Sequence, residues 1–183
     1  MKRVVVPLAE GVEEIEAVVV VDVLRRAEIE VVTAATGNNT TVTASRGVVL
    51  VADTLWESLE LDSFDALVLP GGGPGTRRLG EDQRVLEAVR EFAQAGKVVA
   101  AICAAPMVLG AAGILEGRAA TCYPSCESGL TGANYSAQEE VVVDGNLVTS
   151  QGPGTSFKFA LALIEKLAGE ELAASVAADL LLT

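Results

Sequence analysis

The sequence predicts a single α/β domain whose mostly parallel, doubly wound sheet is flanked by helices on both faces. Three observations support this prediction. Short apolar, β-branched runs alternate with segments of helical periodicity, an order typical of parallel strands joined by crossover helices. Half of the residues are apolar but only 4% are aromatic, which suits a buried sheet of Val, Leu, Ile and Ala. No linker, repeat or low-complexity segment divides residues 1–183, so we expect one domain arranged as a three-layer sandwich.

The first part of the chain predicts a strand, a helix and a second strand. Residues 4–8 are a β-branched run, apolar side chains recur at helical spacing in residues 13–27, and residues 30–35 are again β-branched. Residues 40–44 and 48–52 then flank a Ser-Arg-Gly turn, so they predict a hairpin.

The middle of the chain predicts a fully buried strand at residues 64–69, which are apolar in all but one position. The run of glycines and prolines at residues 70–75 predicts a tight loop after this strand. Residues 81–94 predict an amphipathic helix, and residues 97–102 a strand that leads into Cys103.

The last part of the chain predicts three helices and a hairpin. Residues 106–112 predict a short helix that begins at a proline. Residues 141–143 and 147–149 flank an Asp-Gly-Asn turn, which is a strong hairpin signal. A Gly-Pro loop then precedes two closing helices at residues 156–168 and 170–178.

Four predicted strand ends carry polar side chains or tight loops: residues 10–16, 71–75, 103–106 and 122–126. Ligands of doubly wound sheets bind beyond the carboxyl ends of the strands. We therefore expect these four segments to converge on one pocket.

The charge and the apolar runs exclude several classes of partner. The chain has 13 Lys and Arg against 25 Asp and Glu, and its net charge of −12 would repel a nucleic acid. The longest apolar stretch, residues 17–24, contains Asp22 and is far shorter than the roughly 20 residues that span a bilayer. Residues 4–9 are too short for the apolar part of a secretory signal, so we expect a cytoplasmic protein that does not enter membranes.

The cysteine and histidine counts narrow the chemistry further. Three cysteines do not suit a disulfide framework and would remain thiols in a reducing compartment. The sequence contains no histidine, which removes the usual general base, the usual metal ligand and any Cys-His pair.

Cys103 lies where a buried strand turns into a helix, among the small residues Ala101, Ala104 and Ala105. Such a turn exposes a nucleophile, and the free amides of the helix N-terminus favour a thiolate. We therefore expect a reactive Cys103 whose pKa is lowered. The alternative is a buried cysteine that behaves as a small, unreactive apolar residue.

Four stretches together resemble the DJ-1 branch of the ThiJ/PfpI superfamily. The resemblance lies in residues 100–106 (AAICAAP), 8–16 (LAEGVEEIE), 69–72 (LPGG) and 149–157 (TSQGPGTSF), in the order and spacing of the family. It covers essentially the whole chain and implies a flavodoxin-like fold of the DJ-1/PfpI type, a homodimer, and chemistry that needs no cofactor.

The resemblance also implies roles for individual residues. Cys103 would be the oxidisable nucleophile, and Glu16 a protonated carboxyl that hydrogen-bonds its sulfur. The backbone amides of Gly72 and Ala104 would stabilise an oxyanion or the oxygens of a sulfinate. A carboxyl buried beside a thiolate should have a raised pKa because two negative charges repel. The alternative for Glu16 is a helix N-terminal acid stabilised by the dipole, as we expect for Glu13 and Glu14.

Five further residues are expected to bind substrate or to support the site: Tyr123, Arg46, Arg26, Gly71 and Pro153. Arg26 and Arg46 match arginines that the family places near the site and the dimer contact; the alternative is that they are solvated surface charges. Asp22, within an apolar helix, is expected to pair with an arginine.

Tyr123 marks a departure from the family. Members credited with glyoxalase or peptidase activity generally have a histidine at this position. No subunit of a homo-oligomer can supply one, so a Cys-His peptidase or glutaminase is excluded. The Tyr123 hydroxyl can orient a carbonyl, although a phenol, with an ordinary pKa of about 10, is a poor base at neutral pH.

Cys122 and Cys126 lie either side of Tyr123, but the two further ligands of a zinc site are missing, so no metal is expected. If Tyr123 faces the pocket on an extended segment, Cys122 faces away, which leaves Cys126 as the candidate resolving thiol for Cys103. The alternative is an inert loop cysteine. The glycine loop at residues 71–75 lacks the motifs of nucleotide sites, and the loop at residues 152–155 can serve simply as a turn and helix cap.

These observations lead to a stress-protection hypothesis. Cys103 would react with peroxide, as a redox sensor, or with small reactive carbonyls, as a cofactor-independent glyoxalase or protein deglycase. The first alternative is a non-enzymatic, redox-regulated chaperone or interaction module that binds client proteins. The second is a catalytically inactive scaffold. The apolar surface at residues 18–24 exceeds what one helix needs to cover a sheet, which favours a homodimer.

Overall fold

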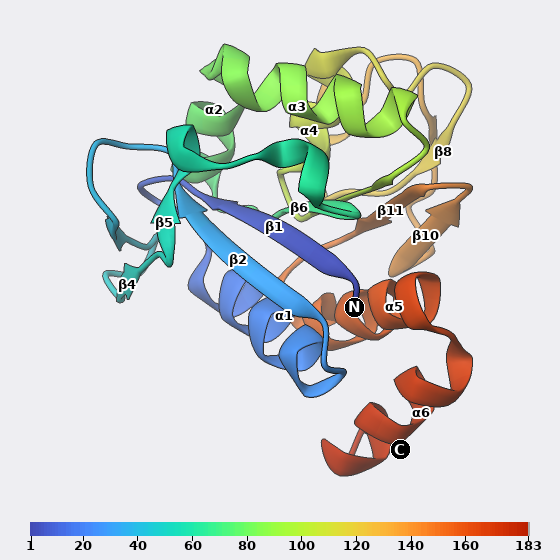
Figure 1. Cartoon of the computed structure of the whole chain (residues 1–183). Helices are drawn as coiled ribbons and strands as arrows, with labels where there is room; N and C mark the ends of the chain where they lie inside the picture. The colour runs from blue at the N-terminus through green and yellow to red at the C-terminus, as the bar shows by residue number, and fades with distance from the viewer. Residues whose placement is uncertain (183) are drawn as a thin grey trace.

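The central feature of the fold is a seven-stranded sheet in the order β10-β11-β7-β6-β1-β2-β5, seen in a computed structural model that describes residues 1–182. All neighbouring strands run parallel except the β10–β11 hairpin. Helices cover both faces of the sheet, with α2, α3 and α4 on one side and α1, α5 and α6 on the other (Figure 1). The predicted doubly wound α/β sandwich is confirmed.

The strands of the central sheet agree with the apolar runs of the sequence to within a few residues. The exception is β5, which has only two residues and was not predicted. The strands are β1 (Arg3–Leu8), β2 (Glu30–Ala35), β5 (Thr54–Leu55), β6 (Ala66–Leu69), β7 (Val98–Ile102), β10 (Val141–Asp144) and β11 (Leu147–Ser150).

The helices also follow the predicted periodicity, with one correction in the glycine-rich run. This run is only in part a loop, because α2 begins at Gly73, where Pro74 suits the first helical turn. A separate helix, α3, then begins after Asp82, whose side chain accepts the amide of Arg84 as a cap. The helices are α1 (Glu14–Arg26), α2 (Gly73–Glu81), α3 (Gln83–Gln94), α4 (Pro106–Ala112), α5 (Ser156–Ala168) and α6 (Glu170–Asp179).

Short elements complete the fold. The strands β3 (Thr41–Thr43) and β4 (Val49–Val51) form the predicted hairpin, while β8 (Ala119–Ala120) and β9 (Asn134–Tyr135) pair with each other beside the main sheet. Four single turns of 3-10 helix lie in the loops: η1 (Trp56–Ser58), η2 (Leu61–Ser63), η3 (Glu127–Gly129) and η4 (Pro153–Thr155).

The core lies in two layers because side chains of a strand point alternately to the two faces of the sheet. On β1, Val4 and Val6 pack with residues of α1 and α5 such as Val20 and Phe159. Val5 points the other way, into a cluster with residues of α3 and α4 such as Val89. The helices on both faces are thus held by burial of aliphatic side chains.

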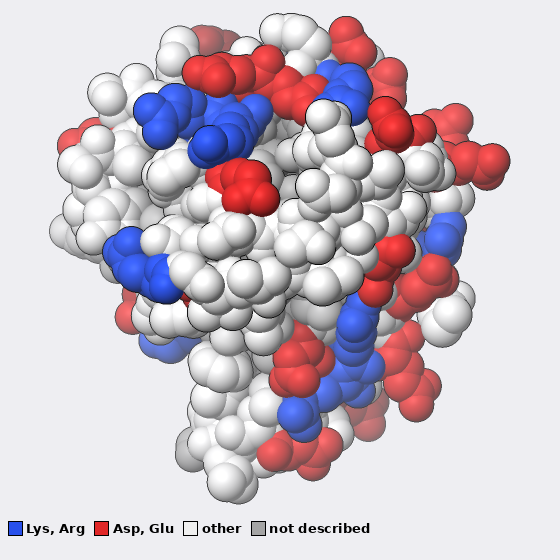
Figure 2. All heavy atoms as spheres, turned by 90° about the vertical axis from the view of Figure 1, so that its left-hand side faces the viewer, with Lys and Arg blue, Asp and Glu red and all other residues white. Residues whose placement is uncertain are grey.

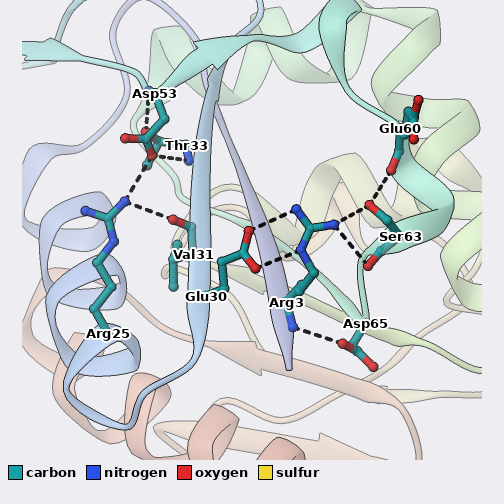
Figure 3. Close-up of polar contacts among 9 residues, drawn as sticks. All are labelled: Arg3, Arg25, Glu30, Val31, Thr33, Asp53, Glu60, Ser63 and Asp65. Carbon is teal, nitrogen blue, oxygen red and sulfur yellow. Dashed lines mark hydrogen bonds and ion pairs between the residues drawn. The ribbon is translucent and has the colours of Figure 1, made fainter. Parts of the chain in front are cut away.

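Polar contacts join β1, β2 and β5, the last three strands at one edge of the sheet (Figure 3). The Asp53 carboxylate accepts the amide and hydroxyl of Thr33 at 2.9 and 2.8 Å and pairs with Arg25 at 3.0 Å. Asp53 immediately precedes β5, so these bonds hold this short edge strand on β2. Arg3 on β1 forms a two-bond ion pair with Glu30 on β2, both bonds at 2.9 Å.

The β3–β4 hairpin docks on the loop that follows β1. The amide of Gly11 donates to the Thr43 carbonyl at 2.8 Å, and the amide of Ser45 donates to the Val12 carbonyl at 2.7 Å.

In the part of the chain that the structure describes, no helix is both long and apolar enough to cross a membrane.

Candidate active site

The predicted site lies at the carboxyl ends of β1, β6 and β7, which are adjacent in the sheet. The chain crosses from β1 to β2 on one side and continues from β6 to β7 on the other, so this is a switch point of the topology. The loops after β1 and β6 contact each other: Glu13 N donates to the Gly71 carbonyl at 3.0 Å, and Gly75 N donates to the Gly11 carbonyl at 3.2 Å.

Cys103 follows β7 in a left-handed backbone conformation, with φ of 65°. A residue with a side chain adopts this conformation only at some cost in free energy, and neighbours must hold it. Here its amide donates to the Ser150 carbonyl at 2.9 Å, and its carbonyl accepts the Tyr123 amide at 2.8 Å. The chain then enters α4 at Pro106, so the strand, cysteine and helix form the sharp turn that the sequence predicts.

Two glycines leave the space that this arrangement needs. A Cβ atom on Gly71 would lie 2.7 Å from Cys103 Cβ and 2.7 Å from Glu16 Oε2. Gly72 has φ of 90°, and a Cβ there would lie 2.4 Å from the Gly11 carbonyl oxygen and 2.6 Å from Glu13 N. Only glycine fits at either position without displacing backbone.

Glu16 extends from the first turn of α1 into this space and is 0% exposed. Its Oε2 accepts the amide of Gly71 at 2.7 Å, while Oε1 is buried without a hydrogen-bond partner among the described residues. Burial raises the pKa of Glu16 to about 7, although hydrogen bonds with Cys103 and the Gly71 amide act in the opposite direction. A neutral carboxyl suits the geometry, because its O–H can donate to the sulfur.

Burial, together with the negative charge of Glu16 and the hydrogen bond with it, raises the pKa of the Cys103 thiol to about 12. The backbone amides of Gly72 and Ala104 contact the thiol and lower its pKa. The predicted lowering of the Cys103 pKa is therefore wrong in direction. The side chain is only 9% exposed, and this burial outweighs the amides of a seven-residue helix.

Cys103 and Glu16 nevertheless act as one titrating pair. Each changes the pKa of the other, so the first proton lost near pH 7 belongs to the pair, and one proton remains between the two groups. When Glu16 holds that proton it is neutral, so no negative charge on Glu16 disfavours the Cys103 thiolate. The nucleophilic form is thus a neutral Glu16 beside an ionised Cys103 whose sulfur faces two amides.

Tyr123 and the late Gly-Pro loop lie beside the turn. The Tyr123 side chain is 47% exposed, and its ring atom Cδ2 would be 3.2 Å from a Cβ on Gly152. Pro153 begins η4, and Thr155 within η4 contacts the Ser150 hydroxyl at 2.7 Å. Tyr123 is therefore close to the backbone of Cys103 and accessible at the rim of the site.

The side chains of the two predicted arginines bond to groups other than Cys103 and Glu16. Arg26 is in the last turn of α1, ten residues after Glu16, or about 15 Å along the helix axis. It pairs with Asp22 at 2.8 Å, as predicted for Asp22, and both side chains are exposed. Within one chain the structure does not bring Arg26 to the site. Arg46 lies in the exposed hairpin turn, where its guanidinium donates to the Ser45 carbonyl at 3.4 Å.

Glu14 supports the site, whereas the sequence predicted only a dipole-stabilised acid at this position. It is buried, and its carboxylate accepts the Ser45 hydroxyl and the Arg46 amide, both at 2.9 Å. Burial raises the pKa of Glu14, but the hydrogen bonds outweigh this effect and the pKa is lowered overall. Glu14 thus ties α1 to the hairpin turn. One sequence feature could have indicated this role. Residues two positions apart on a helix point to different sides, so Glu14 has a different neighbour from Glu16.

The other two cysteines lie near each other. Cys122 is fully buried, as expected for a side chain that faces away from Tyr123, and Cys126 is partly buried. Burial raises the pKa of Cys122 to about 12, with a further contribution from Cys126. A role for Cys126 in resolving oxidised Cys103 stays a prediction. Residues 1–182 contain no cluster of three or more His, Cys, Asp or Glu that could hold a metal ion.

Comparisons with known proteins agree with this geometry. The DJ-1/PfpI family model matches residues 2–166. Protein dj-1beta of Drosophila melanogaster is 44% identical over 182 residues, which cover 98% of this chain and 97% of the relative. Protein DJ-1 homolog B of Arabidopsis thaliana is 45% identical over 170 residues, 92% of this chain, but this chain spans only 39% of that relative. A protein of Caenorhabditis elegans named glutathione-independent glyoxalase DJR-1.2 is 36% identical over 163 residues, 88% of this chain and 86% of the relative.

Solved structures give the same result. The crystal structure of Drosophila melanogaster DJ-1beta has a TM-score of 0.95 at 43% identity, over 98% of this chain and 97% of that one. A structure of Toxoplasma gondii DJ-1 described as oxidized has a TM-score of 0.94 at 39% identity, over 99% and 98% of the two chains. Since the family model covers nearly the whole chain and the fold agrees end to end with these structures, this chain belongs to the DJ-1/PfpI family.

Proposed function

We propose that this chain is a cysteine-dependent stress-protection protein in which Cys103 reacts with small reactive carbonyls or with peroxide. The observation that carries the proposal is the buried pair of Glu16 and Cys103, with the amides of Gly72 and Ala104 directed at the sulfur. The pair supplies a nucleophile, a proton donor and donors for developing negative charge within one pocket.

The name of the Caenorhabditis elegans relative supports the carbonyl reaction, and the chemistry can be written for a 2-oxoaldehyde such as methylglyoxal. The Cys103 sulfur bonds to the aldehyde carbon, and Glu16 gives its proton to the carbonyl oxygen, which forms a hemithioacetal. The Glu16 carboxylate then removes the proton from that carbon and delivers it to the neighbouring carbon, while the hydroxyl proton of the hemithioacetal passes to the neighbouring carbonyl oxygen. The product is a thioester of a 2-hydroxy acid. Water cleaves the C–S bond, releases the hydroxy acid and restores the thiol. The net reaction consumes one aldehyde and one water and needs no cofactor.

The peroxide reaction uses the same atoms. The Cys103 thiolate attacks one peroxide oxygen, the O–O bond breaks, and the products are a sulfenic acid and hydroxide. A second peroxide oxidises the sulfenic acid to a sulfinate and leaves water. The amides of Gly72 and Ala104 and the neutral Glu16 can donate to the sulfinate oxygens, which favours this oxidation state.

The deciding experiment compares methylglyoxal consumption by the wild type, Cys103→Ala and Cys122→Ala. We expect turnover by the wild type and Cys122→Ala and none by Cys103→Ala. Equal inactivity of all three proteins would remove the enzymatic proposal. Mass spectrometry of peroxide-treated protein then tests the sensor: an unmodified Cys103 would remove that function as well.

A second candidate function is a non-enzymatic, redox-regulated chaperone or interaction module. Tyr123 favours this non-enzymatic function. It occupies the position of the family's histidine, and without a histidine the chain lacks the usual group for proton transfer. Peroxide-treated and untreated protein should then differ in suppressing the aggregation of a client protein, and Cys103→Ala should abolish the difference. Failure of Cys103 to react with iodoacetamide at pH 6 would instead favour an inactive scaffold.

We also propose a homodimer that uses the face formed by α1 and the β3–β4 hairpin. Large apolar side chains are exposed there, and a hollow of about 290 Å³ between α1 and β4 is lined in part by Val18, Val21 and Leu50. Figure 2 shows a broad uncharged area on this side of the molecule, between groups of charged side chains. The exposed apolar residues are Ile15, Val18, Val48, Val49 and Val51. A reducing, cytoplasmic setting is part of the proposal, since it would keep all three cysteines as free thiols.

A further inference from the structure

Glu13, Gly71 and Glu16 are joined to one another by three hydrogen bonds. Its side-chain Oε2 accepts the amide of Glu16 at 2.9 Å and so caps the first turn of α1. Its own amide donates to the Gly71 carbonyl at 3.0 Å. The Gly71 amide in turn donates to Glu16 Oε2 at 2.7 Å. Glu13, Gly71 and Glu16 therefore form a closed ring of contacts.

This ring extends to the sulfur through Gly72. The backbone of Glu13 packs against Gly72 so closely that a Cβ there would lie 2.6 Å from Glu13 N. The Gly72 amide contacts the Cys103 thiol. A shift of Glu13 would thus move the carboxyl, through the cap, and the amide that faces the sulfur, through Gly72.

Glu13 also carries a charge that acts on Glu16, since its negative charge raises the Glu16 pKa. The other acids nearby are directed elsewhere: Glu14 bonds to Ser45, and Asp22 pairs with Arg26. The elements that pack against α1 face it mainly with apolar side chains. These are Val4, Val6 and Leu8 of β1, Val31 and Ala35 of β2, and Phe159, Leu163 and Ile164 of α5. Apart from Glu13, the titratable group that acts on Glu16 is Cys103.

We propose that Glu13 is a positioning residue for the Cys103–Glu16 pair, because its cap and its bond to Gly71 hold the Glu16 carboxyl against the Gly71 amide. This inference rests on the proposed function, because it describes how the same pair is prepared for reaction. Glu13 is half-buried and does not itself touch the substrate in this proposal. Its role is to set the pH range in which the site reacts.

The test separates the charge of Glu13 from its hydrogen bonds. Glu13→Gln keeps a side-chain carbonyl that can accept the Glu16 amide but removes the charge, while Glu13→Asp keeps both. Glu10→Gln removes one charge from the same loop, where the Glu10 carboxylate accepts the Thr43 amide instead, and is the matched control. Carbon-13 NMR of labelled glutamate carboxyls follows the titration of Glu16, assigned by its loss in Glu16→Gln.

We expect the Glu16 carboxyl to titrate near pH 7 in the wild type, in Glu13→Asp and in Glu10→Gln. In Glu13→Gln the midpoint should fall by about half a pH unit, as expected for a partly solvated charge one helical turn away. The pH profile of Cys103 alkylation by iodoacetamide, followed by peptide mass spectrometry, should shift by the same amount. Glu13→Ala, which also loses the cap, should lower the Tm by roughly 2–4 °C.

An unchanged midpoint in Glu13→Gln would overturn the inference, and so would an equal shift in Glu10→Gln, which would show a general effect of net charge. These readouts do not depend on turnover. If methylglyoxal is not consumed but the midpoint shifts, the proposed carbonyl reaction fails and the positioning role stands. If turnover occurs and the midpoint does not shift, the positioning role fails and the proposed carbonyl reaction stands.

Discussion

Gly71 donates its amide to Glu16 at 2.7 Å, and its Cα faces both the Glu16 carboxyl and the Cβ of Cys103. One residue without a side chain thus lies against both the acid and the thiol. The distance between the two reactive groups is therefore set by this short piece of backbone.

Gly71→Ala should disable the site, because the new methyl group would lie 2.7 Å from both Cys103 Cβ and Glu16 Oε2. Overpacking of this kind costs about 1–3 kcal/mol of the free energy of unfolding. We expect that loss in urea denaturation, together with at least tenfold slower alkylation of Cys103. Gly73→Ala is the control, since a Cβ there would have nothing within 4 Å, and its stability and alkylation rate should stay near wild type.

The stability of the wild type should fall as the pH rises from about 4.5 to about 7. The folded protein binds the Glu16 proton more tightly than the unfolded chain, so the contribution to stability is complete below the unfolded pKa and disappears as the pH passes the folded pKa. A rise of the Glu16 pKa from 4.5 to about 7 corresponds to about 3 kcal/mol of the free energy of unfolding. Urea denaturation at pH 5 and pH 8 measures it, and Glu16→Gln should show much less dependence on pH in this window. A wild type that gains stability over the same range would contradict a buried neutral Glu16.

Glu14→Gln should loosen the hairpin turn without changing the chemistry. Loss of charge weakens the bonds to the Ser45 hydroxyl and the Arg46 amide, and we expect the unfolding free energy to fall by about 1 kcal/mol. Amide exchange at Arg46 should become faster while the alkylation rate of Cys103 stays within twofold. Because the Glu14 pKa is lowered, its contribution is fully present above the unfolded pKa of 4.5 and is lost as the pH falls through the lower, folded pKa. An alkylation rate that changes as much as the stability would show that Glu14 belongs to the reactive pair.

Val51→Asp should dissociate the proposed dimer. Val51 lies on β4 and is 71% exposed in the single chain, so a charge there has little effect on the fold but disrupts an apolar contact between two copies. Light scattering at micromolar concentration should give the mass of a dimer for the wild type and of a monomer for the variant. Val143→Asp, on β10 at one edge of the central sheet, is the matched control and should remain dimeric. A monomeric wild type would remove the proposal.

The sequence predicted the sheet well because its strands are local patterns. Val4, Val5 and Val6 indicate β1 by composition alone, whereas β5 has two residues and exists because Asp53 holds it on Thr33 of β2. That contact joins positions 20 residues apart and leaves no local pattern. The start of α2 was missed for a related reason, since glycines favour a loop until the packing of Gly72 and Gly75 against the loop after β1 fixes their conformation.

The site could be predicted only in part. The turn at Cys103 was visible from its small neighbours, but the choice of Glu16 over an ordinary helix acid depended on the family resemblance. The direction of the Cys103 pKa depends on how much water reaches the sulfur, which is a property of the packed structure. The arginines show the same limit: Arg26 was placed near the site by resemblance, and in one chain it pairs with Asp22 at the other end of α1.

The close packing of Gly71 and Gly72 has a consequence for the range of reactions open to this scaffold. At these inner positions a single added methyl group would collide with neighbouring atoms, so one residue cannot be replaced without changing the others. The acid, the sulfur and the two amides are therefore expected to be retained together. Tyr123, half exposed at the rim, is under no such restriction. Altered substrate preference is therefore easiest to obtain there, where a ring can be replaced without rebuilding the machinery beneath it.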